Sequence, residues 1–109
     1  MTEARPRKLV LYETLGGRCP WQDWFDGLKD RRTQQSVDAR LLRLQRGNLG
    51  DTKAVGGGVW ELRLHIEPGF RIYFAQDGDT LIVLLCGGSK GSQTRDVERA
   101  KAYWRDYRS

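Results

Sequence analysis

Residues 58–74 read GVWELRLHIEPGFRIYF, and their alternation of apolar and polar side chains constrains the fold more than any other feature of the chain. Apolar residues occupy every second position on both sides of the Glu-Pro-Gly segment: Trp60, Leu62, Leu64, Ile66, Phe70, Ile72 and Phe74. A period of two is typical of a strand that buries one face. The segment therefore predicts a β-hairpin with strands at about 58–66 and 70–76.

The flanking segments predict two more strands and three helices. Residues 8–13 (KLVLYE) favour a short strand, and the apolar run ending at Cys86 favours another at about 80–86, joined to the hairpin by an Asp-Gly turn. Apolar residues three and four apart predict helices from Pro20 to about 28, over 31–46, and from Ser92 to about 107. Residues 47–58 (GNLGDTKAVGGG) are expected to form a loop.

The resulting order, β-α-α-β-β-β-α, predicts an α+β fold: a small antiparallel sheet with helices packed on one face. The 109 residues suit a single domain spanning 1–109. A sheet covered on one side leaves its other face available for function.

The charge and the composition limit the partners. The chain has 19 Lys and Arg against 14 Asp and Glu, a formal net charge of +5, which favours polyanionic partners such as nucleic acid. No apolar run could span a bilayer or serve as a signal peptide, so we expect a cytoplasmic protein without membrane association. Cys19 and Cys86 lack metal-ligand spacing and His65 is the sole histidine, so no metal or cofactor is expected.

Polar residues fill the alternate positions of the hairpin: Glu61, Arg63, His65, Arg71 and Tyr73. Because side chains alternate along a strand, all five are predicted to share the solvent-accessible face opposite the helices. Metal-free RNA cleavage needs such groups: arginine for phosphate charge, histidine or carboxylate for proton transfer, and tyrosine for stacking on unpaired bases. A surface that only binds would use the same residue types, so the residues leave both interpretations open.

Two lysines are predicted to lie at the edges of this polar face. Lys90 belongs to the glycine-rich connection CGGSKGSQTRD, which follows a strand and opens a helix, a context that favours anions. Lys53 is expected at the opposite edge. That Lys53 is only a solvated lysine of a loop is an equally weighted alternative. The second helix carries five arginines, interpreted as its wet face or as contacts to RNA or an acidic partner: Arg31, Arg32, Arg40, Arg43 and Arg46.

The hairpin together with residues 81–104 (LIVLLCGGSKGSQTRDVERAKAYW) resembles the RelE/HigB/ParE superfamily of bacterial toxins, most of all its addiction-module killer protein branch. The resemblance spans residues from about 8 to 107. It implies a toxin of a type II toxin–antitoxin pair. RelE- and HigB-like members cleave mRNA in the ribosomal A site without metal, whereas ParE-like members poison DNA gyrase. By the same resemblance, Arg63, Arg71 and Lys90 match basic positions that hold the scissile phosphate.

One departure from the superfamily pattern concerns the proton donor. Many of its RNases place Tyr or His just beyond the loop, and GSQTRDV contains neither. His65 could substitute; alternatively, Lys90 and Arg71 could stabilise the leaving group with help from ribosomal RNA. The candidate catalytic residues are therefore Arg63, His65, Arg71 and Lys90, and the candidate RNA-binding residues are Lys53, Glu61 and Tyr73.

The resemblance thus leads to one function and two alternatives. The expected function is a ribosome-dependent mRNA endoribonuclease that inhibits translation and is neutralised by a HigA-like helix-turn-helix antitoxin. The first alternative is a ParE-like toxin that inhibits DNA gyrase without enzymatic activity, and the second is a catalytically inactive relative of the fold that only binds its antitoxin or DNA. Proton-transfer groups on the polar face favour the RNase, because a protein-binding surface has no need of them.

Overall fold

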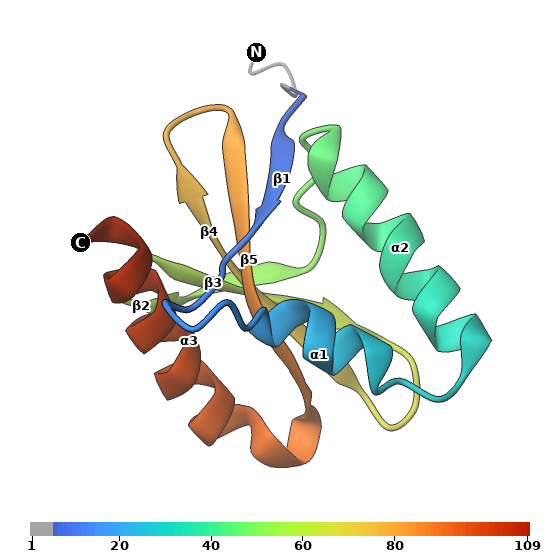
Figure 1. The fold of residues 1–109 in the computed structure, drawn as a ribbon. Coiled ribbons are helices and arrows are strands. Elements are labelled where there is room, and N and C mark those ends of the chain that lie inside the picture. The colour runs from blue at the N-terminus through green and yellow to red at the C-terminus, as the bar shows by residue number, and fades with distance from the viewer. Residues whose placement is uncertain (1–5) are drawn as a thin grey trace.

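A five-stranded sheet and three α-helices make up the part of the chain that the structure, a computed structural model, describes, residues 6–109 (Figure 1). The strands are β1 (Lys8–Leu11), β2 (Thr52–Gly56), β3 (Val59–Leu64), β4 (Phe70–Asp77) and β5 (Leu81–Ser89). The helices are α1 (Pro20–Asp26), α2 (Arg31–Gln45) and α3 (Gln93–Arg108), the last preceded by a 3₁₀ turn, Lys90–Ser92. These elements confirm the predicted α+β class.

The sheet differs from the prediction in two ways. Its order is β1-β5-β4-β3-β2, and β1 runs parallel to β5, so the sheet is mixed rather than antiparallel. The prediction of a loop over 47–58 was also wrong, because β2 forms within it and pairs antiparallel with β3. The strand was not predicted because the segment is rich in glycine, which has a low propensity for β-structure. Such a segment becomes a strand through pairing with its neighbour rather than through its own propensity.

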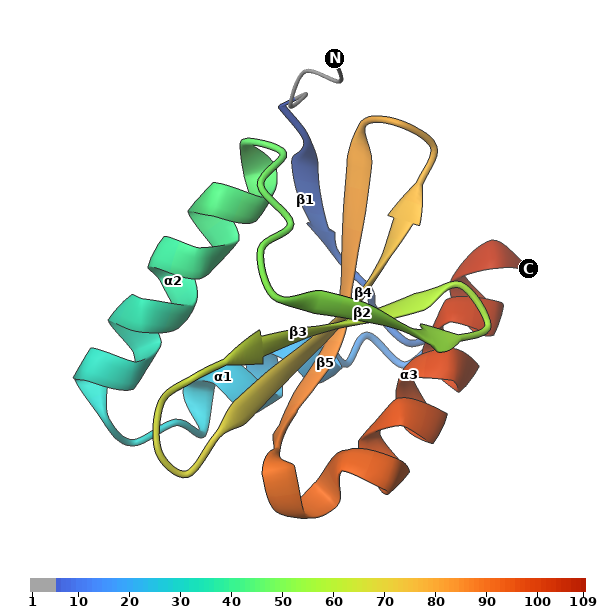
Figure 2. The same ribbon diagram turned by 180° about the vertical axis from the view of Figure 1, so that it is seen from behind.

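Helices cover both faces of the sheet, which corrects the prediction of a one-sided arrangement. Helices α1 and α2 pack on one face, and α3 packs on part of the other (Figures 1 and 2). The α3 side holds apolar residues at one end of the sheet, among them Val59, Ala75 and Val83, which contact the cluster of Ala100 and Trp104. Only the remaining end of that face is left for polar side chains.

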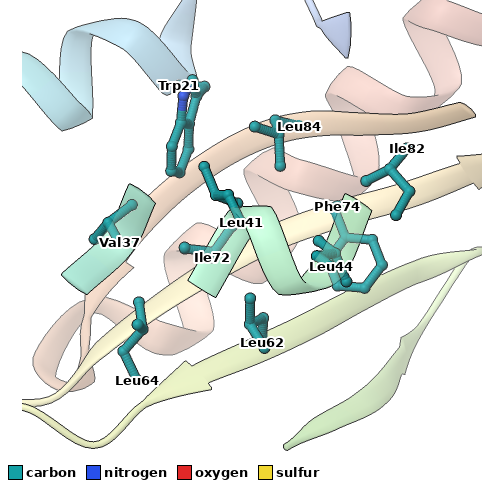
Figure 3. Close-up of a cluster of buried hydrophobic side chains, with 10 residues drawn as sticks. All are labelled: Trp21, Val37, Leu41, Leu44, Leu62, Leu64, Ile72, Phe74, Ile82 and Leu84. Atoms are coloured by element: carbon teal, nitrogen blue, oxygen red, sulfur yellow. The ribbon is translucent and has the colours of Figure 1, made fainter. Parts of the chain in front are cut away.

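The main core lies between α2 and the sheet (Figure 3). Asp30 caps α2, its side chain accepting a hydrogen bond of 3.0 Å from the Arg32 N–H. The helix then buries one apolar face against alternate residues of the hairpin. The helix residues are Val37, Leu41 and Leu44, and the hairpin residues are Leu62, Leu64, Ile72 and Phe74. The predicted alternation is thus confirmed, and it fixes which hairpin residues face away from α2.

The described residues contain no helix that is both long and apolar enough to cross a membrane.

Candidate functional site

Two arginines lie side by side on the face of the sheet that also carries Glu61. Arg63 of β3 is directly opposite Arg71 of β4, and Gly88 of β5 continues the same row. Two like charges in register repel one another. A carboxylate two residues away on the same face of β3, Glu61, compensates them.

The carboxylate of Glu61 is completely buried and accepts hydrogen bonds from four side chains. Oε1 receives Arg63 Nε at 3.2 Å and Arg71 Nη1 at 3.0 Å. Oε2 receives the Tyr73 hydroxyl at 3.1 Å and Gln93 Nε2 at 2.9 Å. Glu61 therefore holds the side chains of both arginines in place through hydrogen bonds to Oε1.

The environment keeps Glu61 ionised and Tyr73 protonated. Burial alone would raise the pKa of the Glu61 carboxyl group, but hydrogen bonds from Gln93, Arg63 and Tyr73 and the charge of Arg71 outweigh it, so that the pKa is lowered. Burial, with the charge and hydrogen bond of Glu61, raises the pKa of the Tyr73 phenol. Glu61 thus acts as an acceptor and Tyr73 as a donor at neutral pH.

The prediction that Glu61 and Tyr73 would be accessible to a ligand was wrong, because both are 0% exposed. They lie on the predicted face, directly opposite one another. The expectation failed because α3 covers this part of the sheet and brings Gln93 onto Glu61. Neither side chain can stack on a base or contact RNA directly in this arrangement.

The four candidate catalytic residues line one hollow. It has a volume of about 410 Å³ and lies between the end of β3, the β3–β4 turn and the 3₁₀ turn. Arg63, His65, Arg71 and Lys90 are all in its lining. A hydrogen bond of 3.0 Å from the Lys90 backbone N–H to the Gly69 carbonyl joins the lysine loop to the β3–β4 turn.

The two arginines differ in how much of each reaches the hollow. The Arg63 side chain is 35% exposed and is bonded to Glu61 through Nε, which leaves its terminal nitrogens for a ligand. The Arg71 side chain is 14% exposed, and its own Nε has no partner among the described residues. This Nε is itself buried, so a ligand can reach Arg71 only through the exposed part of its guanidinium group.

His65 lies just past the end of β3 and pairs with a carboxylate that the sequence did not indicate. Its Nε2 is 2.5 Å from Asp51 Oδ2, and the two side chains are 77% and 48% exposed. Because a carboxylate oxygen accepts, the proton of this bond sits on Nε2, and Nδ1 is the nitrogen left for proton transfer. Asp51 directly precedes β2, the strand that was not predicted. The contact between Asp51 and His65 therefore becomes evident only from the pairing of β2 with β3.

Lys53 lies apart from the hollow. It is opposite Glu61 in the β2–β3 register, is exposed, and lines another depression together with Gln93 and Thr94. Gln93, the first residue of α3, was also not predicted to belong to the site. Its contact joins residues 32 positions apart, and nothing in the local pattern marks it.

The chemistry of the hollow suits an anion. Arg63, Arg71 and Lys90 outnumber the single carboxylate in the lining, Glu67, and His65 adds a group able to move a proton. Among the described residues, no group of three or more His, Cys, Asp or Glu could hold a metal ion.

Comparison with known proteins places the chain in a family. Residues 23–105 match the family described as Phage derived protein Gp49-like (DUF891). The chain is also similar to an uncharacterized protein of Haemophilus influenzae, with 41% identity over 81 residues that cover 74% of this chain and 82% of the relative. The chain therefore belongs to the Phage derived protein Gp49-like family, an addiction-module toxin-like family.

Proposed function

We propose that this protein is a RelE/HigB-like toxin of a type II toxin–antitoxin system and that it cleaves mRNA on the ribosome without a metal. The observation that carries the proposal is the shared hollow. Four residues chosen from the sequence for their chemistry, from β3, from its end, from β4 and from the loop before α3, line one cavity. Membership of an addiction-module toxin-like family supports the same conclusion.

The arginines stabilise the phosphate as it gains charge. Cleavage through the 2′-hydroxyl passes through a pentavalent phosphate, whose charge a guanidinium meets with its planar fork of donors. Glu61 holds Arg63 and Arg71 in place before the substrate arrives, so little reorganisation is needed during the reaction. The buried carboxylate therefore positions the catalytic groups and does not itself touch the RNA.

Proton transfer falls to His65 and Lys90. The free Nδ1 of His65 accepts the proton of the 2′-hydroxyl while Asp51 steadies the ring through Nε2. Lys90, in the same lining, donates a proton from its ammonium group to the leaving 5′-oxygen, which balances the proton that His65 takes up. This division leaves Lys53 outside the chemistry, as an edge cation that contacts RNA backbone.

The partners follow from the charge of the site. We propose that a HigA-like antitoxin covers the hollow with acidic side chains, since a cationic concavity is complementary to them. Translated mRNA on the ribosome is the proposed substrate.

Toeprinting of a translated mRNA with the purified protein tests the proposal. Wild-type protein should produce cleavage stops on ribosome-bound mRNA, and treating the protein with EDTA before it is added to the Mg²⁺-containing ribosomes should not reduce them. Arg71→Ala should reduce the rate about 10²–10³-fold, the usual cost of losing one group that stabilises transition-state charge. Arg71→Lys should restore little, because an ammonium cannot replace the fork.

The control is Arg105→Ala, which removes the same charge from the exposed last turn of α3 and should cleave normally. No stops with wild-type protein, together with inhibition of supercoiling by DNA gyrase, would overturn the RNase assignment in favour of the gyrase toxin.

A further inference from the structure

A second hollow adjoins the first. It has a volume of about 410 Å³ and lies between α2, the loop before β2 and the end of β3. Residues 63–66 line both hollows, so the end of β3, with His65, forms the wall between them. Lys90 lines the first hollow, and residues of α2 line the second.

The second hollow has an excess of positive charge. Arg40 and Arg43 of α2 line it together with Arg63, and Asp51, which is paired with His65, is the single carboxylate in its lining. Burial and the nearby charge of Arg43 lower the pKa of Arg40. An anion between these arginines would relieve that repulsion.

The two arginines of α2 have separate roles. Arg40 is 8% exposed and donates to the Asn48 carbonyl, at 3.2 Å, and to the Leu49 carbonyl, so it builds the floor of the hollow. Gly50 lets the loop pass over it: its φ is +59°, and a Cβ there would lie 1.9 Å from Arg40 Nη2. Arg43 is exposed and supplies the charge that a ligand can reach.

A ligand with regularly repeated negative charges fits two cationic hollows that share a wall. A single small anion would occupy one of them, whereas a polynucleotide strand places successive phosphates in both. The partly buried side chain of Ile66, present in both linings, offers apolar surface to a sugar or base between the phosphates.

We propose that the second hollow binds the nucleotide next to the cleaved bond, so that one RNA strand crosses the His65–Asp51 wall with its scissile phosphate at Arg71 and a flanking phosphate at Arg43. This inference rests on the proposed function, because the first hollow must hold the scissile phosphate. It gives the toxin a subsite for single-stranded RNA that extends beyond the reacting groups.

Binding of two uncleavable 2′-O-methyl RNAs to the full chain tests the subsite. The dinucleotide has one phosphodiester and fills the first hollow alone, whereas the hexanucleotide can fill both. Arg43→Gln should weaken the hexanucleotide about fivefold at 0.1 M salt and make the slope of log K against log salt shallower by about 0.7, the contribution of one phosphate contact on a single strand. Affinity for the dinucleotide should not change.

Two further variants make the outcomes decisive. Arg105→Gln removes the same charge from the last turn of α3 and should alter neither affinity nor slope. If Arg43→Gln behaves like Arg105→Gln while Arg71→Ala weakens both RNAs, the subsite is wrong and the proposed function stands. If Arg71→Ala also leaves both affinities unchanged, or if the wild type binds neither RNA, the subsite is overturned, and the toeprinting of wild type and Arg71→Ala decides the proposed function separately.

Discussion

Glu61→Gln tests whether the buried carboxylate holds the site together. The substitution keeps the shape of the side chain and removes its charge. Gln93 and the Tyr73 hydroxyl can both reverse their roles and accept from the new amide, so the hydrogen bonds to Oε2 can be rebuilt. The charge cannot be rebuilt, and Arg71, only 14% exposed, is left without its counter-ion.

The expected loss of unfolding free energy is about 3 kcal/mol. Removing one partner of a buried ion pair costs roughly 3–5 kcal/mol. The lower end applies because the amide oxygen still accepts from the arginines and because the second cation, Arg63, is 35% exposed and partly solvated. Urea unfolding followed by tryptophan fluorescence would measure this loss.

The pH dependence identifies the cause. Because the folded state lowers the pKa of Glu61, its contribution to stability is present above the ordinary value of 4.5 and is lost as the pH falls through the lower, folded value. The difference between wild type and Glu61→Gln should therefore be largest near pH 7 and should shrink below pH 4.5.

The matched control is Glu98→Gln on α3. Glu98 is 70% exposed and pairs with Lys101 at 3.4 Å, so this change should cost less than about 1 kcal/mol. A loss for Glu61→Gln as small as that of the control, or a loss that stays constant from pH 7 to pH 3, would refute the role assigned to the carboxylate.

Two further substitutions probe the chemistry and the packing. His65→Gln should slow ribosomal cleavage by about 10²–10⁴, the usual contribution of a proton-transfer group, and Asp51→Asn should cause a smaller loss; an unchanged rate for His65→Gln assigns proton transfer to another group. Gly87→Ala should cost about 1–3 kcal/mol in urea unfolding, because its Cβ would lie 2.3 Å from ring carbons of Trp24. Gly91→Ala, whose Cβ meets nothing within 4 Å, should be nearly neutral, and equal stability of the two variants would contradict the packing argument.

Most of the correct predictions about the site came from the alternation of apolar and polar residues in the hairpin. A period of two decides which side chains share a face, and it correctly placed Arg63 and Arg71 together and Leu62 and Ile72 opposite them. It does not decide which helix covers each face. The apolar residues at one end of the polar face, Val59 among them, were a signal for a covering helix, and they meet Trp104 of α3.

The contacts that complete the site could not be predicted, because they depend on pairing between distant segments. Asp51 reaches His65 only because β2 forms and aligns beside β3. Gln93 reaches Glu61 only because α3 crosses the sheet at that point. Neither residue belongs to a periodic pattern, and a glycine-rich segment such as residues 56–58 gives little sign of the strands on either side of it.

The burial of Glu61 beneath two arginines helps to distinguish an RNase from a toxin that only binds a protein. A long arginine side chain loses about 2 kcal/mol of rotamer freedom when it is ordered. Here Glu61 orders Arg63 and Arg71 as the chain folds, so the loss is not incurred when a ligand binds. Fixed donors are most useful where charge develops at one point in a transition state, whereas an adaptable protein interface gains little from two arginines that a buried carboxylate holds in place. This preorganisation favours the stabilisation of a reacting phosphate.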